Sequence, residues 1–280
     1  MVTCSGLNLT ATPRIDFTAD VDQLFFHSNR ITELGAFMLA TAPTNVAILN
    51  FDNNTLTRVD VNAFFWFRQL VTLTLNANLL SELPTGALSN LSLLAGLSLS
   101  DNRLTAAPLF PVLPVMEQIT LDGNPLVTFA ALNFAGVWPT LTSLTVRNSL
   151  KNISSLPADQ FSRFQTLKYL DLSRGALAFL PDDIFAGPPS RTLVGVMLQV
   201  TRACVCLVAL LSFQRGTNIF VTCQQSNNLA KLPTSLLDGL KYNLITMSVF
   251  GCLFVLCEFS LFFLNTPCLP TKLVLLRTTI

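Results

Sequence analysis

The stretch LVTLTLNANLL at residues 70–80 carries aliphatic residues at its first, fourth, sixth and eleventh positions and asparagine at its ninth. The same frame fits LAGLSLSDNRL at residues 94–104 and MEQITLDGNPL at residues 116–126. The aliphatic residues at positions 1, 4 and 6 are expected to point inward from a short strand. No single unit of this length can bury them, so the pattern predicts a stack of units.

The frame recurs along most of the chain. VDQLFFHSNRI from Val21 and VAILNFDNNTL from Val46 match it, and LTSLTVRNSL from Leu141 and LKYLDLSRGAL from Leu167 match it more loosely. The seven starts are separated by 25, 24, 24, 22, 25 and 26 residues, and a degraded eighth copy, LVGVMLQVT, begins at Leu193. A fixed period of this length is the mark of a repeat architecture.

The units resemble leucine-rich repeats of the typical extracellular subclass. The consensus L-x-x-L-x-L-x-x-N-x-L carries this resemblance, together with the trailing segments LPTGALSNL at 83–91, LPADQFSRF at 156–164 and LPDDIFAG at 180–187. The resemblance implies an α/β repeat solenoid, a horseshoe with one short parallel strand per repeat on its concave face. It covers about residues 2–225 and says little about function.

Two internal rows are expected to hold the stack together. Position 9 is asparagine in five repeats, and an inward amide there can bond backbone groups left unpaired at the turn. This row lapses at Ser149 and Gly175, and the sixth repeat carries about two extra residues, so we expect less regularity there. An aromatic stack is predicted on the convex side, with members Phe64, Phe134, Phe161 and Phe185.

Residues 1–20 resemble the last part of the family's N-terminal cap. Such a cap carries about four cysteines, whereas Cys4 is the one present, and Met1 leads into polar sequence without a basic and an apolar signal region. We therefore expect that the chain begins inside its cap and that its targeting signal precedes Met1. A cytosolic protein in which Cys4 stands by chance is the alternative.

The C-terminal cysteines resemble a closing cap over residues 193–243. Cys204-Val205-Cys206 follows the eighth strand, the apolar run LVALLSF comes next, and Cys223 follows. The family pattern places a fourth cysteine about twenty residues later, but the next one is Cys252. Cap disulfides are favoured, buried free thiols are second, and a zinc site is disfavoured because three cysteines without a nearby histidine ligate zinc poorly.

Residues 244–264, LITMSVFGCLFVLCEFSLFFL, contain a single charge, Glu258. At about 1.5 Å per residue a helix of this length matches a hydrocarbon core of about 30 Å, so a C-terminal hydrophobic helix that contacts a lipid bilayer is predicted. A buried cap helix is the alternative, and a disulfide at Cys252 would favour it. The expected organisation is thus a cap at 1–20, seven repeats at 21–192, a last repeat and cap at 193–243, the helix at 244–264 and a tail at 265–280.

Composition excludes several classes of function. The 17 Lys and Arg residues nearly balance the 16 Asp and Glu residues, so no basic surface points to nucleic acid. With one histidine, His27, and no glycine-rich phosphate loop, neither an active site, a cofactor nor a metal is expected. The odd count of 7 cysteines leaves at least one unpaired within the chain.

Four N-glycosylation sequons fit a cell-membrane or extracellular location. They begin at Asn8, Asn53, Asn90 and Asn152. Asn53 ends its strand, so a glycan there would shade one edge of the concave face.

The concave face is the expected binding surface, because strand positions 2, 3, 5, 7 and 8 point outward across it. Its middle carries small hydroxyl residues, and bulky or charged groups gather at its two ends. Aromatic and arginine side chains dominate many interfaces. The candidate contacts are Phe25, His27, Asp52, Asp122, Arg147, Tyr169, Asp171 and Arg174.

These features together favour a non-catalytic recognition module, the ectodomain of a membrane-tethered or secreted receptor or adhesion protein. Its ligand would be a protein or a glycan on the concave face, bound by shape and scattered polar contacts with weak salt dependence. An intracellular leucine-rich-repeat scaffold with reduced cysteines is the alternative.

Overall fold

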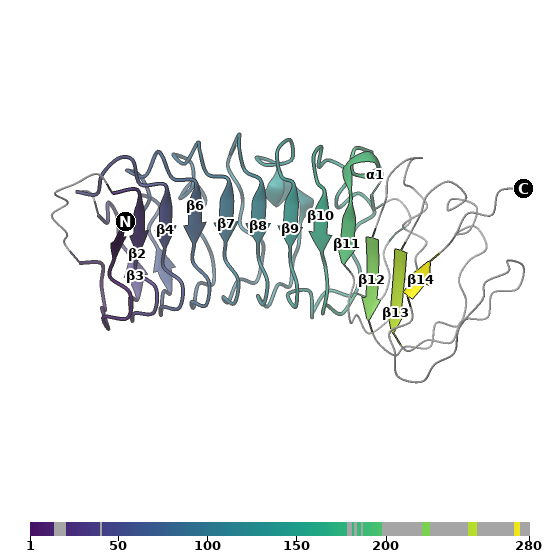
Figure 1. Cartoon of the computed structure of the whole chain (residues 1–280), viewed down its shortest axis with the longest axis horizontal. Helices are drawn as coiled ribbons and strands as arrows, with labels where there is room; N and C mark the ends of the chain where they lie inside the picture. The colour runs from purple at the N-terminus through teal and green to yellow at the C-terminus, as the bar shows by residue number, and fades with distance from the viewer. Residues whose placement is uncertain are drawn as a thin grey trace, which may run out of the picture.

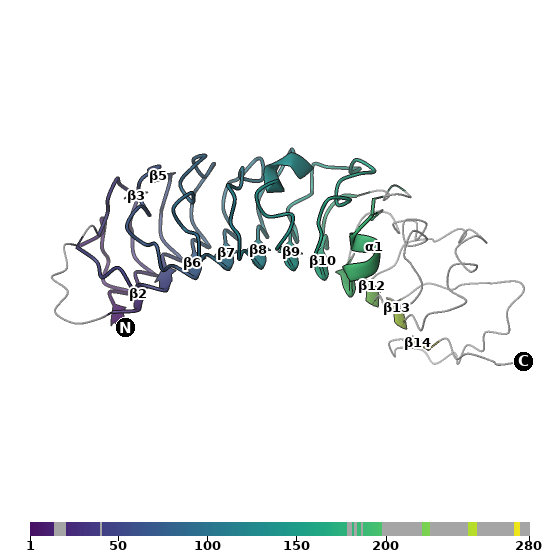
Figure 2. The same ribbon diagram turned by 90° about the horizontal axis from the view of Figure 1, so that it is seen from above.

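The computed structural model describes residues 1–13, 21–39, 41–177, 181, 184, 185 and 187–197, and the strands at 220–224, 246–250 and 272–274. Across these residues the chain is a solenoid in which each turn adds one short strand to a single sheet (Figure 1). Seen from above, the array is curved and the sheet lines its concave side (Figure 2). The predicted parallel-strand solenoid is therefore confirmed.

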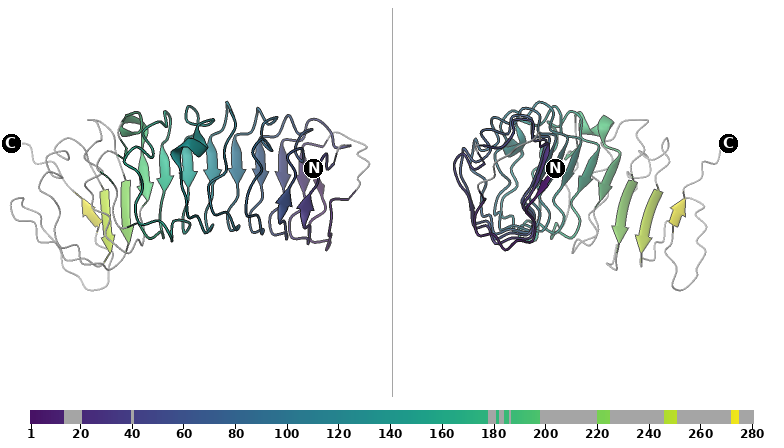
Figure 3. Two further views of the ribbon diagram at one scale, coloured as in Figure 1. Left: turned by 180° about the vertical axis from the view of Figure 1, so that it is seen from behind. Right: turned by 60° about the vertical axis from the view of Figure 1, so that its left-hand side comes forward.

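The main sheet runs in chain order from β1 to β14, skipping β3 and β5, and its twelve described strands form one row (Figure 3). Its neighbours are parallel, except for the antiparallel pair β13 and β14. The strands are β1 Val2–Thr3, β2 Gln23–Phe25, β4 Ile48–Asn50, β6 Thr72–Thr74, β7 Gly96–Ser98, β8 Gln118–Thr120, β9 Ser143–Thr145, β10 Tyr169–Asp171, β11 Gly195–Met197, β12 Phe220–Gln224, β13 Thr246–Phe250 and β14 Lys272–Val274.

The outer wall of the solenoid has little regular structure. Two short strands, β3 Glu33–Leu34 and β5 Arg58–Val59, pair with each other there, away from the main sheet (Figure 2). The described helices are one turn each: the 3₁₀ helix η1 Ala131–Phe134 and α1 Pro189–Thr192.

The strands are in register at repeat position 4. Leu73 of β6 pairs with Leu49 of β4 on one side and with Leu97 of β7 on the other, and all three are buried. Burying such a side chain stabilises a fold by about 1.5–3 kcal/mol. Since each leucine is covered by its neighbours on both sides, the core is one continuous column, as the repeat pattern predicts.

The position-9 asparagines form the predicted ladder. The Nδ2 group of Asn54 donates to the carbonyl oxygens of Phe51 and Phe26, each at 3.0 Å, and its Oδ1 accepts from the Ile31 N–H at 3.0 Å. Each amide thus bonds its own repeat and the one before it. The same pattern recurs at Asn78, Asn102 and Asn124.

The sixth repeat keeps part of this ladder, which the sequence alone had suggested would lapse there. The Ser149 hydroxyl donates to the Leu121 carbonyl at 2.7 Å and accepts from the Asn124 N–H at 3.0 Å. The lapse is complete at Gly175, which has no side chain. A Cβ at that position would lie 3.2 Å from the Cβ of Leu150, so the backbones pack closely here.

The predicted aromatic stack is present in the C-terminal half of the array. The ring centroids of Phe161 and Phe185 lie 5.8 Å apart, and Phe164 bridges Phe134 and Phe161 at 5.8 and 6.1 Å. Phe64 is buried, but the structure gives it no ring contact with this group. The next repeat carries Leu88 at the equivalent position, and this aliphatic residue interrupts the row.

Position 8 of each repeat has a left-handed backbone, which the repeat pattern did not predict. The φ angle there lies between 51° and 70° at Ser28, Asn53, Ala77, Asp101, Gly123, Asn148 and Arg174. Such angles are costly for most residues other than glycine, asparagine and aspartate. The chain needs this conformation to turn out of the strand immediately before the ladder asparagine.

Residues 2–4 continue the repeat register ahead of the first repeat, because they add one more strand to the sheet beside β2. Val2 pairs with Leu24 of β2, and the Cys4 N–H donates to the Phe25 carbonyl at 2.7 Å. Cys4 therefore stands at position 6, where later repeats carry Phe26 and Phe51. It is a free thiol, half-buried against the core, and this burial raises its pKa.

Most of the predicted C-terminal cap lies outside the described residues, including Cys204, Cys206 and Cys252. Cys223 is in β12, whose backbone pairs with β11 and β13. The helix predicted over 244–264 is wrong for Thr246–Phe250, which is strand β13, and the rest of that segment lies outside the described residues. No helix within the described part of the chain is long and apolar enough to cross a membrane.

Candidate functional site

The concave face is built from strand positions 3 and 5 and from the residues that follow each strand. Both positions are partly exposed in most strands, while position 4 between them is buried. The middle of the face carries small polar residues, as predicted. They include Thr72, Thr74, Ser98, Ser100 and Thr120.

Position 7 carries a second side-chain ladder, on the concave side of the asparagine ladder. The Asn76 N–H donates to the Asp52 carboxylate at 2.6 Å, and the Ser100 N–H donates to Oδ1 of Asn76 at 2.8 Å. The Arg147 N–H donates to the Asp122 carboxylate at 2.7 Å. In the described structure these three amides have no main-chain acceptor, so the side chains of Asp52, Asn76 and Asp122 each bond the backbone of the next repeat.

Two of the predicted contact residues, Asp52 and Asp122, are thus members of this position-7 ladder. Burial raises the pKa of the Asp122 carboxyl, and the nearby Asp171 raises it further, while the Arg147 N–H partly offsets both. The Asp122 carboxylate is therefore held by backbone and partly withdrawn from solvent. An outside ligand would have to compete with the Arg147 amide for it.

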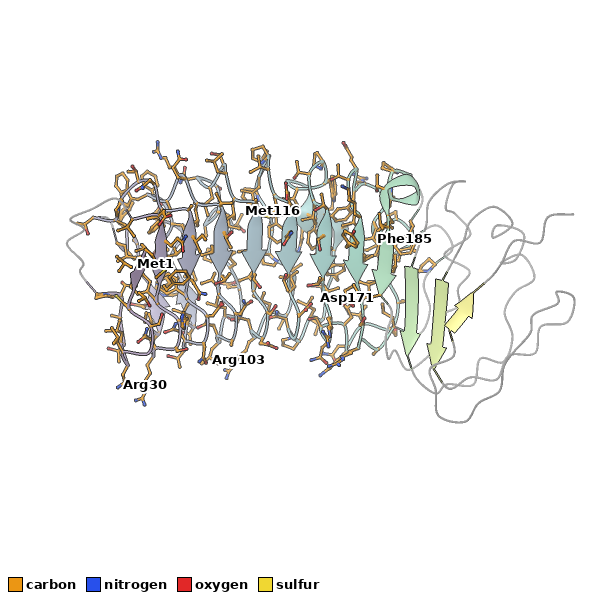
Figure 4. The ribbon with its side chains drawn as sticks, viewed as in Figure 1. Met1, Arg30, Arg103, Met116, Asp171 and Phe185 are labelled. Carbon is orange, nitrogen blue, oxygen red and sulfur yellow. The ribbon has the colours of Figure 1, made fainter. Side chains whose placement is uncertain are left out.

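Asp171 is also committed to the fold. Its side chain is only 9% exposed, and it accepts the N–H of Ser173 at 2.8 Å. The side chain of Asn50 has the same role in the second repeat, where its Oδ1 accepts the main-chain N–H of Asp52 at 2.8 Å. Figure 4 places Asp171 at the lower end of β10, toward the edge from which Arg30 and Arg103 project.

The candidates at the two ends of the face are far apart in the array. Phe25 and His27 lie at the N-terminal end, where their rings contact edge to face with centroids 6.4 Å apart. Nδ1 of His27 lies 3.3 Å from the Ser28 hydroxyl. Since these two candidates belong to the first repeat and the arginine and tyrosine candidates to the sixth and seventh, the structure does not gather them into one site.

Three predicted residues and one that was not predicted make up an exposed set on β10 and β11 and in the turns that follow β9 and β10. We call it the C-terminal concave patch, and its members are Arg147, Tyr169, Arg174 and Met197. Tyr169 is 48% exposed and Met197 is 39% exposed. Arg147 and Arg174 are exposed as well.

Tyr169 is supported from below by a glycine. It pairs with Gly195 of β11, and a Cβ on Gly195 would lie 3.3 Å from Cδ1 of the Tyr169 ring. The ring therefore rests against bare backbone while its other side faces solvent. An aromatic side chain held in this way loses little conformational freedom when a ligand covers it.

Sequence reasoning missed Gly195, Met197 and the position-7 ladder. The first two lie in the degraded eighth repeat, where the frame was too weak to assign outward positions. The ladder left a signal in Asp52, Asn76 and Asp122, because short side chains with an acceptor oxygen recur at one position. In the sequence alone, such residues cannot be told apart from exposed polar residues that contact a ligand.

All four sequon asparagines are exposed. Asn8 and Asn53 lie in turns with positive φ, and Asn53 also donates to the Ser28 hydroxyl at 3.3 Å. Asn90 and Asn152 are on loops outside the strands. Each side chain is thus accessible to a glycosyltransferase.

Within the described residues, no three His, Cys, Asp or Glu side chains gather as a metal-binding group. The carboxylates of the concave face point at backbone amides instead of converging on a common point. The concave face is therefore arranged as an extended surface that a ligand could contact, and its described carboxylates do not form a cluster.

Comparison with known proteins agrees with the repeat register. A family model described as leucine rich repeat matches residues 68–126. Podocan-like protein 1 of Homo sapiens is 32% identical over 145 residues, which cover 51% of this chain and 27% of that protein. Tsukushi of Rattus norvegicus is 32% identical over 173 residues, covering 60% of this chain and 48% of that protein.

A third relative is a probable glycoprotein hormone G-protein coupled receptor of Anthopleura elegantissima, 30% identical over 130 residues that cover 46% of this chain and 14% of the receptor. The chain thus spans between about a quarter and a half of the first two relatives and less of the receptor. The register of the strands and these matches together identify the array as leucine-rich repeats, which resemble those of the extracellular type.

Proposed function

We propose that the protein is a non-catalytic recognition module that binds a protein ligand through the C-terminal concave patch. The observation that carries the proposal is Tyr169, an exposed ring backed by Gly195 and flanked by the exposed Met197. Tyrosine and arginine are the residue types that supply most binding energy in protein interfaces. Arg147 and Arg174 add cations at the margin of the patch.

The distribution of hydrogen bonds supports this choice within the concave face. Asp52, Asp122 and Asp171 accept hydrogen bonds from backbone amides, whereas the side chains of Tyr169 and Arg174 make no hydrogen bond to any residue in the described part of the chain. Groups with free hydrogen-bonding capacity are those that can exchange water for a ligand at low cost. The relatives include a protein named as a hormone receptor, which is in keeping with ligand recognition by such arrays.

The experiment is a binding screen of the full chain, expressed through the secretory pathway and fused to an antibody Fc region. The probes are cells that each display one extracellular protein, and a glycan array tests the glycan alternative. Hits are measured again with Tyr169→Ala, with Arg147→Ala and with Val61→Ala. Val61 is the matched control, because it is an exposed residue near β5 on the convex side.

A protein ligand lost by Tyr169→Ala and Arg147→Ala but kept by Val61→Ala would support the proposal. A ligand that binds all three variants equally would place recognition elsewhere on the molecule. Binding confined to the glycan array would select the glycan alternative instead.

A further inference from the structure

The fourth repeat has an outer wall unlike the others. It is the shortest unit, 22 residues long, and its outer segment PLFPVLPVM at 108–116 repeats proline followed by two apolar residues. Proline lacks an N–H and pushes the preceding residue out of the helical region, so the run of turns found on the neighbouring outer walls is reduced here to one turn at 114–115. It runs without regular structure from Ala107 to Leu113.

Exposure in this segment follows the three-residue period. The third member of each triplet, Phe110, Leu113 and Met116, is buried in the core. The second member faces solvent: Leu109 is 49% exposed, Val112 is 78% exposed and Val115 is 40% exposed. One side of the segment therefore fills the core and another presents a row of aliphatic side chains.

The fifth repeat extends this row. The Phe110 N–H donates to the Asn133 carbonyl at 2.8 Å, and the Leu113 N–H donates to the Gly136 carbonyl at 3.2 Å. These bonds hold η1 against the proline-rich segment, and Gly136 permits the contact because a Cβ there would collide with the Pro111 carbonyl. Leu132 of η1, 64% exposed, is thus brought beside the row. We call Leu109, Val112, Val115 and Leu132 the convex apolar surface.

The convex apolar surface is also free of charge. Residues 104–116 and 123–142, which include the outer walls of these two repeats, contain no Asp, Glu, Lys, Arg or His. Soluble monomers seldom expose contiguous apolar surface without charged residues among it, and such surfaces usually mark interfaces. Depletion of charge is the compositional signal of an interface centre.

Another exposed apolar cluster, on the outer wall of the first two repeats, is different. There Phe37, Phe65 and Trp66 pack against one another with ring centroids 4.9 to 6.3 Å apart, and the Arg68 guanidinium lies over the Phe65 ring. These rings already use each other as partners. The aliphatic side chains of the convex apolar surface have no such cover.

We propose that the convex apolar surface binds a second copy of this chain. An uncharged surface can face itself across a twofold axis without bringing like charges together, which a surface with charges of one sign cannot do. Interfaces between identical subunits are more apolar than interfaces with transient partners. The four exposed side chains are aliphatic and include none of the Tyr, Trp or Arg anchors typical of a hot spot for a different protein. Trp138 of the fifth repeat is already covered by Arg163, whose guanidinium lies 5.1 Å from the centre of its ring.

This dimer would leave the concave face of each copy free to bind a ligand. The strands line the opposite, concave side of the array, so two copies joined through their outer walls would each keep an open concave face (Figure 2). The inference does not depend on the proposed ligand site, since neither surface contains a residue of the other.

The test measures the mass of the full chain by sedimentation velocity over a concentration series, up to the solubility limit. The variants are Val112→Lys and Leu132→Lys, each at a side chain more than half exposed, so that folding is preserved. Val61→Lys is the matched control, an exposed valine on the outer wall of another repeat. Thermal unfolding of each variant verifies that it is folded.

We expect a wild-type dimer whose dissociation constant rises at least about tenfold in Val112→Lys and in Leu132→Lys and is unchanged in Val61→Lys. A wild type that stays monomeric throughout overturns the proposal, as does a dimer that both patch variants retain. Flotation of a monomeric wild type with phosphatidylcholine vesicles, lost in Val112→Lys, would replace the second copy by a bilayer.

Discussion

The Ser149 hydroxyl accepts the N–H of Asn124 at 3.0 Å, so a serine takes up the asparagine ladder where the sixth repeat departs from the consensus. It also donates to the Leu121 carbonyl, as a ladder asparagine would. A serine has one donor, whereas the amide of asparagine has two. The link between the repeats is kept, and within the sixth repeat the Ser149 main-chain N–H bonds the Val146 carbonyl at 3.2 Å.

Asn102→Ala should lower the free energy of unfolding by about 2–4 kcal/mol, because it leaves the buried Leu80 N–H unpaired and removes two further buried hydrogen bonds. The Leu75 and Leu99 carbonyls each lose one of their two amide donors and keep the amides of Asn78 and Asn124. Asn102→Ser should recover part of the loss by analogy with Ser149. Urea unfolding followed by circular dichroism measures both, with Asn90→Ala at an exposed position as the control. A loss at Asn102 no larger than the control's would show that the ladder contributes little.

Asp122→Asn should change the pH dependence of stability. The folded pKa of Asp122 is raised, so the wild-type fold binds the proton more tightly than the unfolded chain does. Wild-type stability from this group is greatest below the ordinary aspartate pKa and is lost as pH rises through the folded pKa. The introduced amide would keep an oxygen for the Arg147 N–H, so the variant should gain on the wild type as pH rises through that window.

The gain should stay below about 1 kcal/mol, because solvent screens a half-exposed carboxylate. Chemical unfolding of both proteins at a series of pH values gives the difference directly. A difference that shrinks as pH rises would contradict the assignment, since it would mean that the ionised carboxylate is the stabilising form.

Ala77→Gly should stabilise the protein by about 0.5–1 kcal/mol. Ala77 has a φ of 51°, and the left-handed conformation costs an L-residue about 1–2 kcal/mol. Glycine avoids this cost, but its greater flexibility stabilises the unfolded chain and offsets part of the gain. Ala95→Gly is the control, at an intermediate position without positive φ, and should destabilise. Thermal unfolding compares the two, and loss of stability in both variants would mean that Ala77 is unstrained.

Protein produced through the secretory pathway should carry N-linked glycans at its four exposed sequons. Treatment with a glycan-removing enzyme should increase its electrophoretic mobility, and Asn-to-Gln changes at Asn8, Asn53, Asn90 and Asn152 should each remove one step. Complete absence of a shift would favour the intracellular scaffold over the extracellular module.

Ligand binding through the C-terminal concave patch should depend weakly on salt. The patch presents two arginines, and the carboxylates nearest to it are already bonded to backbone. Affinity for whichever protein the screen identifies should therefore fall only severalfold between low and high ionic strength. A loss of several orders of magnitude would point to a strongly charged ligand and a different binding mode.

The fold followed from the sequence because its determinants recur. Leu73, Leu97 and Asn78 repeat at constant spacing, and the spacing alone sets the register of the sheet. The left-handed conformation at position 8 could not be predicted, because residues as different as Ala77, Asp101 and Arg174 adopt it. No single residue type recurs at that position to indicate it.

The candidate site was harder to predict, because outward positions carry two kinds of residue that look alike in sequence. Asp122 and Arg147 both read as polar contacts, yet the first is bonded to the backbone of the second. The helix prediction at 244–264 is wrong at Thr246–Phe250 because a short apolar run fits two kinds of element. Its apolar and β-branched residues suit a strand that adds to the sheet as well as they suit a helix.

The position-7 ladder has a consequence for how this surface can diversify. Asp52, Asn76 and Asp122 connect consecutive repeats, so a change at any of them alters stability as well as surface chemistry. The side chains of Tyr169 and Arg174 form no such hydrogen bond between repeats in the described structure. New binding specificities can therefore arise with little loss of stability at strand position 3 and among the turn residues, whereas position 7, and position 5 where it bonds the backbone as at Asn50 and Asp171, are constrained by folding.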